Sequence, residues 1–540
     1  MRVPPIALPV AGSALLWALI FLSVPPSEQE FPLNDDWAYA RGAVLFAEGK
    51  GIHYSNWASM PQLGQWIWSL PFLAVLGKSH TALRLSTIVL SWFGLWAYYD
   101  LLRQEGVPDW KAALLAATLA FNPLFFLLEG TYMTDVPALS MSLAALAFYG
   151  RALAGGGLTL LALGSGIAVL AAVTRQNTII VPVVAAVLLL RNPGLRTRVM
   201  WWAGVILPGI VGIGTHLWLQ GRTDTRLIAP ELPPADVLLL LPFLLVHTFG
   251  LSALPLLLVG DWRRGWAAAG VALAVMLALA IFWNGPGVKY LPYGGLFPYS
   301  ENMITPWGAF AGSRFTGPLE VGARPLVLGS NMRWALTTAG CVAGAFWIAR
   351  VLRREILGLL SWPIVLFSLL QLPFLLVAPD LYDRYLLMLL PGALYLAVPA
   401  RAGFRFQWIP TAGILAAMAA ISMALMHDWL AWNSARWVLG GRALAAGVNA
   451  WDIEGGFEWD GGFSPERSRS ASVGPRRGLT LPFTHRWFPQ VSGRFALSFS
   501  QPPNTIRRDS QEYRLWLSPG PRQFLLIEAG PVSTAIRPSN

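Results

Sequence analysis

Charged residues are scarce in this sequence. Asp, Glu, Lys and Arg make up only 12% of its 540 residues, whereas 55% are hydrophobic and the mean hydropathy is +0.52. A soluble domain usually carries about 25% charged residues, which cover its surface. The composition therefore excludes an ordinary soluble protein and predicts one that lies largely in a membrane.

Cysteine and several catalytic signatures are also nearly or wholly absent. The single cysteine, Cys341, lies inside an apolar run, so no intramolecular disulfide can form. The sequence has no Gly-rich phosphate loop, His–Glu zinc motif, Ser–His–Asp arrangement or βαβ stretch. These absences argue against a soluble two-Rossmann enzyme that uses nucleotide sugars. The net charge of +11 lies largely in short loops, which suits anionic lipid head groups better than nucleic acid.

Apolar runs of about 17–22 residues recur along the chain and are typical of membrane-spanning helices. We expect an all-α polytopic membrane protein with about 13 transmembrane helices, its N-terminus inside and its C-terminus outside. The first run, 6–24, follows Met1 and Arg2 and lacks a small-residue cleavage pattern. It is therefore interpreted as an uncleaved anchor rather than a signal peptide.

The orientation depends on the apolar stretch 61–76, which is only about 16 residues long and contains Gln62 and Gln65. If this stretch crosses the membrane, the basic loop from Arg103 to Lys111 falls outside. If it lies flat or re-enters, every basic loop falls on the cytoplasmic side, as the positive-inside rule requires. The non-crossing arrangement is therefore predicted.

The chain divides into two predicted domains. Residues 1–426 form the transmembrane domain, with a first outside loop at 25–82 that carries juxtamembrane helices and a long outside loop at 284–327. Residues 427–540 are polar and rich in Gly, Pro and Arg, and they predict a small β-containing domain outside the membrane. Its expected elements are a helical stretch near 428–447 and strands at 494–500, 513–517 and 524–528.

Asp35 and Asp36 are adjacent carboxylates about ten residues beyond the first span. One interpretation is helix capping at the start of a surface helix. The other is a general base that removes a proton from an acceptor, with the second carboxylate raising its pKa or sharing a divalent metal. His53, in the same loop, is a candidate ligand or base, although a lone histidine is more often a hydrogen-bonded structural residue.

Three further motifs place ionisable groups at predicted outer span ends. Thr134-Asp135-Val136-Pro137 suits a helix cap or an anion-binding helix start. Arg175, in Arg175-Gln176-Asn177, is either an interfacial arginine or a clamp on a lipid phosphate. The motif Tyr382-Asp383-Arg384-Tyr385 is either a loop-stabilising ion pair or part of a donor-phosphate site. Charges at span ends in so apolar a chain often mark a site.

These motifs together resemble those of glycosyltransferases with the GT-C fold. The stretch Asn34-Asp35-Asp36-Trp37-Ala38-Tyr39 is similar to their acidic first-loop motif, and the similarity is greatest to bacterial glycosyltransferase family 39, the ArnT-like and RgtA/B/C/D-like group of the protein O-mannosyltransferase superfamily. The other matching stretches are Gly77 with Leu83-Arg84-Leu85, Thr134–Pro137, Arg175–Asn177 and Tyr382–Leu386. The similarity is good over residues 1–200, patchy to 400 and weak beyond.

The resemblance implies an inner-membrane enzyme that transfers a sugar from a polyprenyl-phosphate donor to a lipid, glycan or protein acceptor on the extracytoplasmic face. It implies that Asp35 is the base, with Asp36 as the alternate, that Asp135 is the second-loop acid and that Arg384 contacts the phosphate. No sequon-binding Trp-Trp-Asp motif is present, which argues against N-glycosylation. A polytopic transporter or a flippase for lipid-linked sugars is the alternative function.

Overall fold

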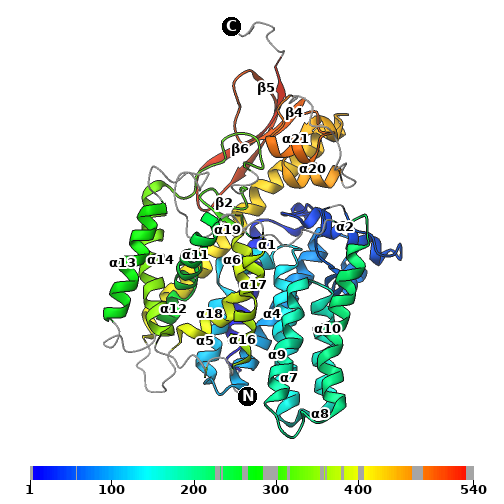
Figure 1. The fold of residues 1–540 in the computed structure, drawn as a ribbon. Helices are drawn as coiled ribbons and strands as arrows, with labels where there is room; N and C mark the ends of the chain where they lie inside the picture. The colour runs from blue at the N-terminus through cyan, green and yellow to red at the C-terminus, as the bar shows by residue number, and fades with distance from the viewer. Residues whose placement is uncertain are drawn as a thin grey trace.

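The computed structural model describes residues 4–55, 57–225, 232, 235–257, 266–283, 302–312, 317–352, 358, 362–378, 382–398, 407–464 and 478–530. Its body is helical, and a small β-sheet lies beyond one end of the helices (Figure 1). This agrees with the expected fold class of apolar helices followed by a small C-terminal β-domain.

Ten helices form the first half of the body. They are α1 (Ala7–Ser23), α2 (Asp36–Ala47), α3 (Leu63–Leu76), α4 (His80–Gln104), α5 (Asp109–Ala120), α6 (Pro123–Glu129), α7 (Asp135–Arg151), α8 (Gly157–Ala172), α9 (Ile180–Leu190) and α10 (Val199–Gln220). The second half contains α11 (Ala235–Ser252), α12 (Leu254–Leu257), α13 (Trp266–Trp283), α14 (Ser330–Val351), α16 (Pro363–Leu370), α17 (Leu372–Leu376), α18 (Leu390–Ala397), α19 (Trp408–Ala445), α20 (Phe457–Phe463) and α21 (Pro482–Trp487).

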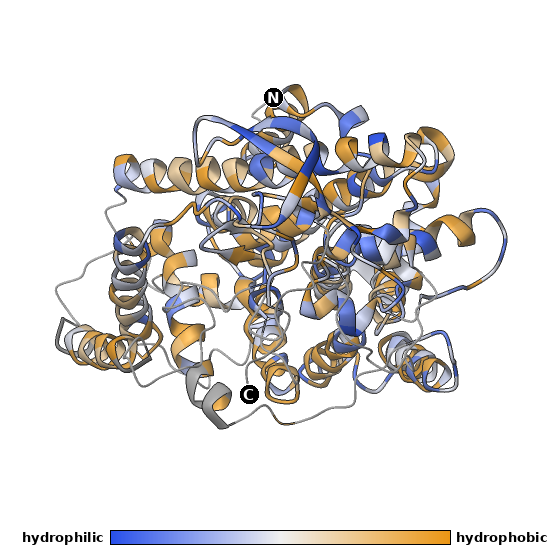
Figure 2. Cartoon of the chain, turned by 90° about the horizontal axis from the view of Figure 1, so that it is seen from above, coloured by the Kyte–Doolittle hydropathy of each residue, from blue (hydrophilic) through white to orange (hydrophobic). Residues whose placement is uncertain are grey.

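The long helices are mostly apolar, as the hydropathy colours of Figure 2 show, and many of their apolar side chains are exposed. On α10, for example, Ile206, Ile210 and Ile213 are 47%, 61% and 53% exposed. Such a continuous apolar surface is rare on a soluble protein and suits contact with lipid. Within the described residues, five helices are long and apolar enough to cross a membrane, or six if α5 and α6, bent by 65°, form one broken span.

Each of the 13 predicted apolar segments contains at least one helix. Several of these helices are too short or too broken to count as spans by length alone, including α1, α9 and the pair α16 and α17. Pro373, at the start of α17, explains the break between those two, because proline cannot donate the hydrogen bond of a helix interior. The number of crossings and their direction remain predictions.

The buried Glu129 fixes the end of α6 where the chain turns toward the first loop. Its carboxylate accepts hydrogen bonds from Ser13 (3.1 Å) and Trp17 on α1, and from Ser91 (2.8 Å) on α4. A fully buried carboxyl is costly unless such donors satisfy it. Three helices are therefore held together just before the segment that contains Asp135.

Helix α3 has both ends close to the same loop. Glu48, which precedes α3, forms ion pairs with Lys50 (2.6 Å) and with Lys78 (2.9 Å), which follows α3. The backbone N–H groups of His80 and Thr81 also donate to Glu30 in the first loop. These contacts tie the end of α3 and the start of α4 to the first loop, and the non-crossing arrangement stays a prediction.

The C-terminal domain grows out of one uninterrupted helix. Helix α19 runs 38 residues through the expected last span and beyond it, so the predicted boundary at 427 falls within a helix. The sheet has the order β3 (Ile453–Glu454), β4 (Phe495–Ser498), β6 (Pro521–Ala529) and β5 (Thr505–Arg514), with only the β3–β4 pair parallel. Val321 of the long loop pairs with Ser498, so the loop joins this domain. The short hairpin β1 (Ile304–Thr305) and β2 (Gly308–Ala309) lies in the same loop.

The expected strand at 513–517 differs from the observed one. Strand β5 ends at Arg514, and the N–H groups of Trp516 and Leu517 donate to the carboxylate of Asp428 on α19 at 2.6 and 3.0 Å. A helix carboxylate therefore captures the backbone that would otherwise extend the strand.

If α3 does not cross the membrane, Lys50→Cys and Lys78→Cys should both react with a membrane-impermeant maleimide added outside intact cells. Both side chains are at least half exposed, and each loses only a surface ion pair. The background is Cys341→Ala, because Cys341 is the single native cysteine. Arg103→Cys, in a predicted cytoplasmic loop, should react only after permeabilisation. Labelling of Lys50→Cys and Lys78→Cys from opposite sides would show that α3 crosses.

Candidate active site

A cavity of about 370 Å³ lies where the helical body meets the C-terminal domain. Four of the ionisable residues singled out from the sequence line it: Asp35, Asp135, Arg175 and Arg384. The other described lining residues are Asn34, Tyr39, Trp57, Ser59, Met60, Met133, Asn302, Phe310, Leu319, Tyr382, Tyr385, Phe457, Phe483, Arg486 and Trp487. Motifs up to 350 residues apart in the chain therefore meet at one site.

Asp35 precedes α2 but its side chain does not cap that helix. Oδ1 accepts a hydrogen bond from Trp57 Nε1 at 2.7 Å, and Oδ2 accepts one from an Arg384 terminal nitrogen at 3.2 Å. The capping interpretation is thus wrong for this side chain. An ionised carboxylate has about four acceptor positions, so two of them remain for a ligand.

Asp36 lies outside the cavity lining and is fully buried. Its carboxylate accepts backbone N–H groups from Leu33 (3.3 Å) and Tyr132 (2.9 Å), which ties the first loop to the turn after α6. Burial raises the pKa of Asp36 to about 7. The neighbouring Arg84 donates to the carbonyls of Gln29 and Phe31 and supports the same loop.

Asp135 begins α7 and forms an ion pair with Arg175 at 2.7 Å. The same Arg175 nitrogen donates to Thr134 Oγ1 at 3.1 Å. The second carboxylate oxygen, Oδ2, is buried without a hydrogen-bond partner among the described residues. A buried unpaired oxygen is costly, which is typical of a position that a ligand completes.

The motif at 382–385 separates into a ligand-facing part and a supporting part. Arg384 faces the cavity between Tyr382 and Tyr385, with ring centroids 5.3 and 5.6 Å from the guanidinium carbon. Asp383 is buried behind it and accepts the backbone N–H groups of Met303 (3.0 Å) and Ile304 (2.9 Å). Burial raises the pKa of Asp383 to about 6. Asp383 therefore positions the long loop rather than lining the site.

His53 does not join the cavity. Its imidazole is exposed, and Nε2 lies 2.7 Å from the carbonyl oxygen of Lys50. Of the two interpretations given for His53 above, this contact fits a hydrogen-bonded structural residue.

The aromatic and C-terminal part of the site gave no signal in the sequence. Trp57, Phe457, Phe483, Arg486 and Trp487 line the cavity, yet they come from a loop and two short helices without a motif. Only the fold brings Trp57 to Asp35. With 26 tryptophans in the chain, the local sequence does not separate a tryptophan of a membrane interface from one that lines a cavity.

A divalent metal does not fit the adjacent carboxylates. Asp35 and Asp36 are held by different partners on different sides of the chain, as described above. Across the described residues there is no group of three or more His, Cys, Asp or Glu side chains arranged to hold a metal ion.

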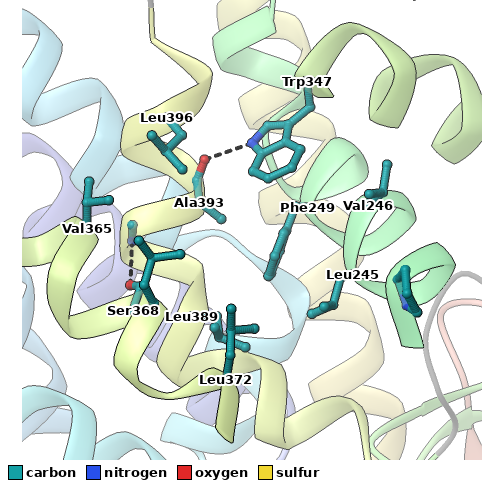
Figure 3. Close-up of a pocket in the computed structure, with 13 residues that line it drawn as sticks. Leu245, Val246, Phe249, Trp347, Val365, Ser368, Leu372, Leu389, Ala393 and Leu396 are labelled. Atoms are coloured by element: carbon teal, nitrogen blue, oxygen red, sulfur yellow. Dashed lines mark hydrogen bonds between the residues drawn. The ribbon is translucent and has the colours of Figure 1, made fainter. Parts of the chain in front are cut away.

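A second cavity, of about 260 Å³, is almost wholly apolar and lies between α11, α14, α16 and α18 (Figure 3). Leu245 and Phe249 line it from α11, Trp347 from α14, and Leu396 from α18. Leu389, at the end of the 3-10 helix η4 (Asp383–Leu389), lines it as well. Because η4 also carries Arg384 and Tyr385, one short helix borders both cavities.

No family model matches this sequence, and no curated protein does either. Among solved structures, the chain is similar to ArnT from Cupriavidus metallidurans, with undecaprenyl phosphate bound and in the apo state. Each match has 14% sequence identity and covers 97% of this chain, with 99% and 98% of the ArnT chain and TM-scores of 0.40 and 0.41. This is the group that the sequence motifs resemble.

The raised pKa of Asp36 predicts a pH-dependent contribution to stability. An unfolded chain releases this proton near pH 3.8, whereas the folded protein holds it to about pH 7, so the contribution falls as pH rises between these values. We expect the melting temperature of Asp36→Asn, relative to wild type, to rise by roughly 2 °C or more between pH 5 and pH 8. The surface variant Asp509→Asn is the control for a general loss of charge. A difference that is constant with pH would contradict this prediction.

Proposed function

We propose that this protein is an integral membrane glycosyltransferase that moves a sugar from a polyprenyl-phosphate donor to an acceptor on the extracytoplasmic face. The observation that carries the proposal is the convergence of Asp35, Asp135, Arg175 and Arg384 on one cavity. A carboxylate with free acceptor positions and two arginines are the groups that transfer from a phosphate leaving group needs.

In the proposed reaction, Asp35 takes the proton of the acceptor hydroxyl. The acceptor oxygen attacks the anomeric carbon from the face opposite the phosphate, and the bond from that carbon to the phosphate oxygen breaks. The bonding electron pair leaves with the phosphate, and the sugar is transferred with inversion. The hydrogen bonds from Trp57 and Arg384 hold the carboxylate of Asp35 in one orientation, which is the requirement for an effective general base.

Two guanidinium groups are available for the donor phosphate. Those of Arg175 and Arg384 lie 5.8 and 5.6 Å from the centroid of the same ring, that of Tyr385. Arg384 Nε has no hydrogen-bond partner among the described residues. The described lining contains three arginines and two aspartates, and this net positive charge favours an anionic ligand. The arginines would stabilise the charge that develops on the leaving phosphate.

The apolar cavity supports a lipid-linked donor rather than a soluble one. Tyr385 borders the polar cavity and Leu389 borders the apolar one, and four residues of a 3-10 helix span only about 8 Å. A phosphate at Arg384 and an isoprenoid chain among Leu389, Phe249 and Trp347 are thus compatible with one molecule. The proposed localisation is the bacterial inner membrane.

A flippase for lipid-linked sugars, or another transporter, would also need arginines for phosphate, but neither would need a base. In the described structure the ionisable groups that meet in the cavity come from helix ends and loops rather than from paired broken helices at mid-span. Asp35 distinguishes the two functions, because only the glycosyltransferase needs a base at this position.

Asp35→Asn should abolish glycosyl transfer, by roughly 10²-fold or more, because the amide cannot accept the proton. Asp36→Asn is the matched variant. It should retain transfer and lose stability, since Asp36 holds only backbone groups. The measurement is mass spectrometry of envelope glycans and lipid-linked sugars in a strain that lacks the gene, complemented with each variant. Near-normal transfer by Asp35→Asn would remove Asp35 as the base and favour the flippase.

Arg384→Gln should lower transfer by roughly 10²-fold, because a neutral side chain cannot stabilise the leaving phosphate. Arg384→Lys should recover part of this loss, since it restores the charge but not the planar fork. Arg442→Gln, on α19, removes an arginine that is 45% exposed and pairs with Asp509 instead. The same complementation assay, with variant levels matched by immunoblot, measures the three. Equal losses from Arg384→Gln and Arg442→Gln would indicate a general charge effect.

A further inference from the structure

One wall of the candidate active site is aromatic, and three of its four rings have no role in the chemistry above. We call it the aromatic wall and define it as Trp57, Phe457, Phe483 and Trp487, all of which line the cavity. The ring centroid of Trp57 lies 5.6 Å from that of Phe457, 6.2 Å from that of Phe483 and 5.7 Å from that of Trp487. Three of the four rings belong to the C-terminal domain.

Arg486 lies beside this wall and lines the same cavity. Its guanidinium carbon is 5.0 Å from the centroid of the Trp487 ring, and its side chain is exposed. Among the described residues no carboxylate forms an ion pair with Arg486, whereas Arg442, Arg494 and Arg508 elsewhere in the C-terminal domain each have one. Its charge is therefore available to a ligand.

Helix α21, which carries Phe483, Arg486 and Trp487, is held rigidly from below. Thr484 Oγ1 lies 2.9 Å from Glu454 and 3.0 Å from Asp460, and the Leu481 N–H donates to Glu454 at 3.0 Å. Glu454 and Asp460 are buried. A wall built on fixed short helices is pre-organised for binding.

We propose that the aromatic wall and Arg486 form the acceptor subsite and bind a glycan whose sugar ring carries a carboxylate or phosphate. The C–H faces of a pyranose ring carry partial positive charge and are attracted to the negative faces of aromatic rings. The planar guanidinium matches the oxygens of a carboxylate or phosphate. This subsite rests on the proposed function, because it is defined by its position next to the base.

The position of Trp57 connects the subsite to the chemistry. Its ring belongs to the aromatic wall, and its Nε1–H donates to Asp35 at 2.7 Å. A sugar that lies against the wall thus has a hydroxyl group close to the carboxylate that would remove its proton. Trp57 acts here as a positioning residue for Asp35.

Two other occupants fit this wall less well. An isoprenoid chain is an uncharged hydrocarbon and cannot pair with Arg486. The apolar cavity of Figure 3 offers it a better environment. An extended peptide is usually held by backbone hydrogen bonds to a strand edge, and none of the described lining residues of the polar cavity lies in a strand.

Direct binding to the purified full chain in detergent tests this subsite without any transfer reaction. The probes are trigalacturonate, maltotriose 6-phosphate, neutral maltotriose and a Ser/Thr-rich peptide, and saturation-transfer NMR gives a Kd for each. We expect at least one anionic sugar to bind roughly fivefold more tightly than maltotriose. Arg486→Gln should remove this preference, and Trp487→Ala should weaken all three sugars by roughly threefold or more.

The matched control is Arg508→Gln, an exposed arginine of the same domain that pairs with Glu528 away from the cavity and should leave the preference intact. The complementation assay with Asp35→Asn tests the base and the binding assay tests the subsite, so a failure of the base role and a failure of the subsite give different results. Equal binding of neutral and anionic sugars would overturn the proposal, as would equal effects of Arg486→Gln and Arg508→Gln. Binding of the peptide alone would overturn it in favour of a protein acceptor.

Discussion

The buried ion pair between Arg436 and Glu458 is the interaction on which the rest of the site depends. Both side chains are 0% exposed, and their atoms lie 2.8 Å apart. Arg436 belongs to α19 and also donates to Asn433 and to the carbonyl of Gly455, while Glu458 belongs to α20 and accepts the N–H of Asn34 at 3.2 Å. Loss of one partner would leave a buried charge unpaired, which typically costs about 3–5 kcal/mol. Helix α19, the C-terminal domain and the residue before Asp35 are therefore joined by one ion pair and its hydrogen bonds.

Two pairs of adjacent residues each combine a cavity-facing residue with a buried one. In Asp35-Asp36 and in Asp383-Arg384, one member faces the cavity and the other is buried behind it. The buried members, Asp36 and Asp383, accept backbone N–H groups from distant loops and so hold the chain in place. Hydrogen bonds from several N–H groups offset part of the cost of burying a carboxylate. Ligand contact and loop attachment are therefore achieved by neighbouring positions of one motif.

The sequence predicted those parts of the structure that depend on local composition. Apolar runs predicted the helices because burial of apolar area and backbone hydrogen bonding act within each segment. Rare charges at helix ends identified Asp35, Asp135, Arg175 and Arg384. The sequence did not identify the aromatic wall, because the residues around an aromatic side chain can be the same in a membrane interface, a core or a binding site. Nor could it find the end of β5, which a carboxylate about 90 residues earlier determines.

The continuity of α19 means that the number of residues in the helix sets the distance between the expected last span and the site. Each residue of an α-helix adds about 1.5 Å of rise and about 100° of rotation. One inserted residue between the expected last span and Arg436 would lift the Arg436–Glu458 pair only slightly but would turn it away from Asn34 of the first loop. Four inserted residues would nearly restore its direction yet raise it by about 6 Å. The length of α19 thus sets both the distance and the rotational orientation of the residues at its end. The length of its outer portion is therefore constrained as tightly as the identity of Arg436.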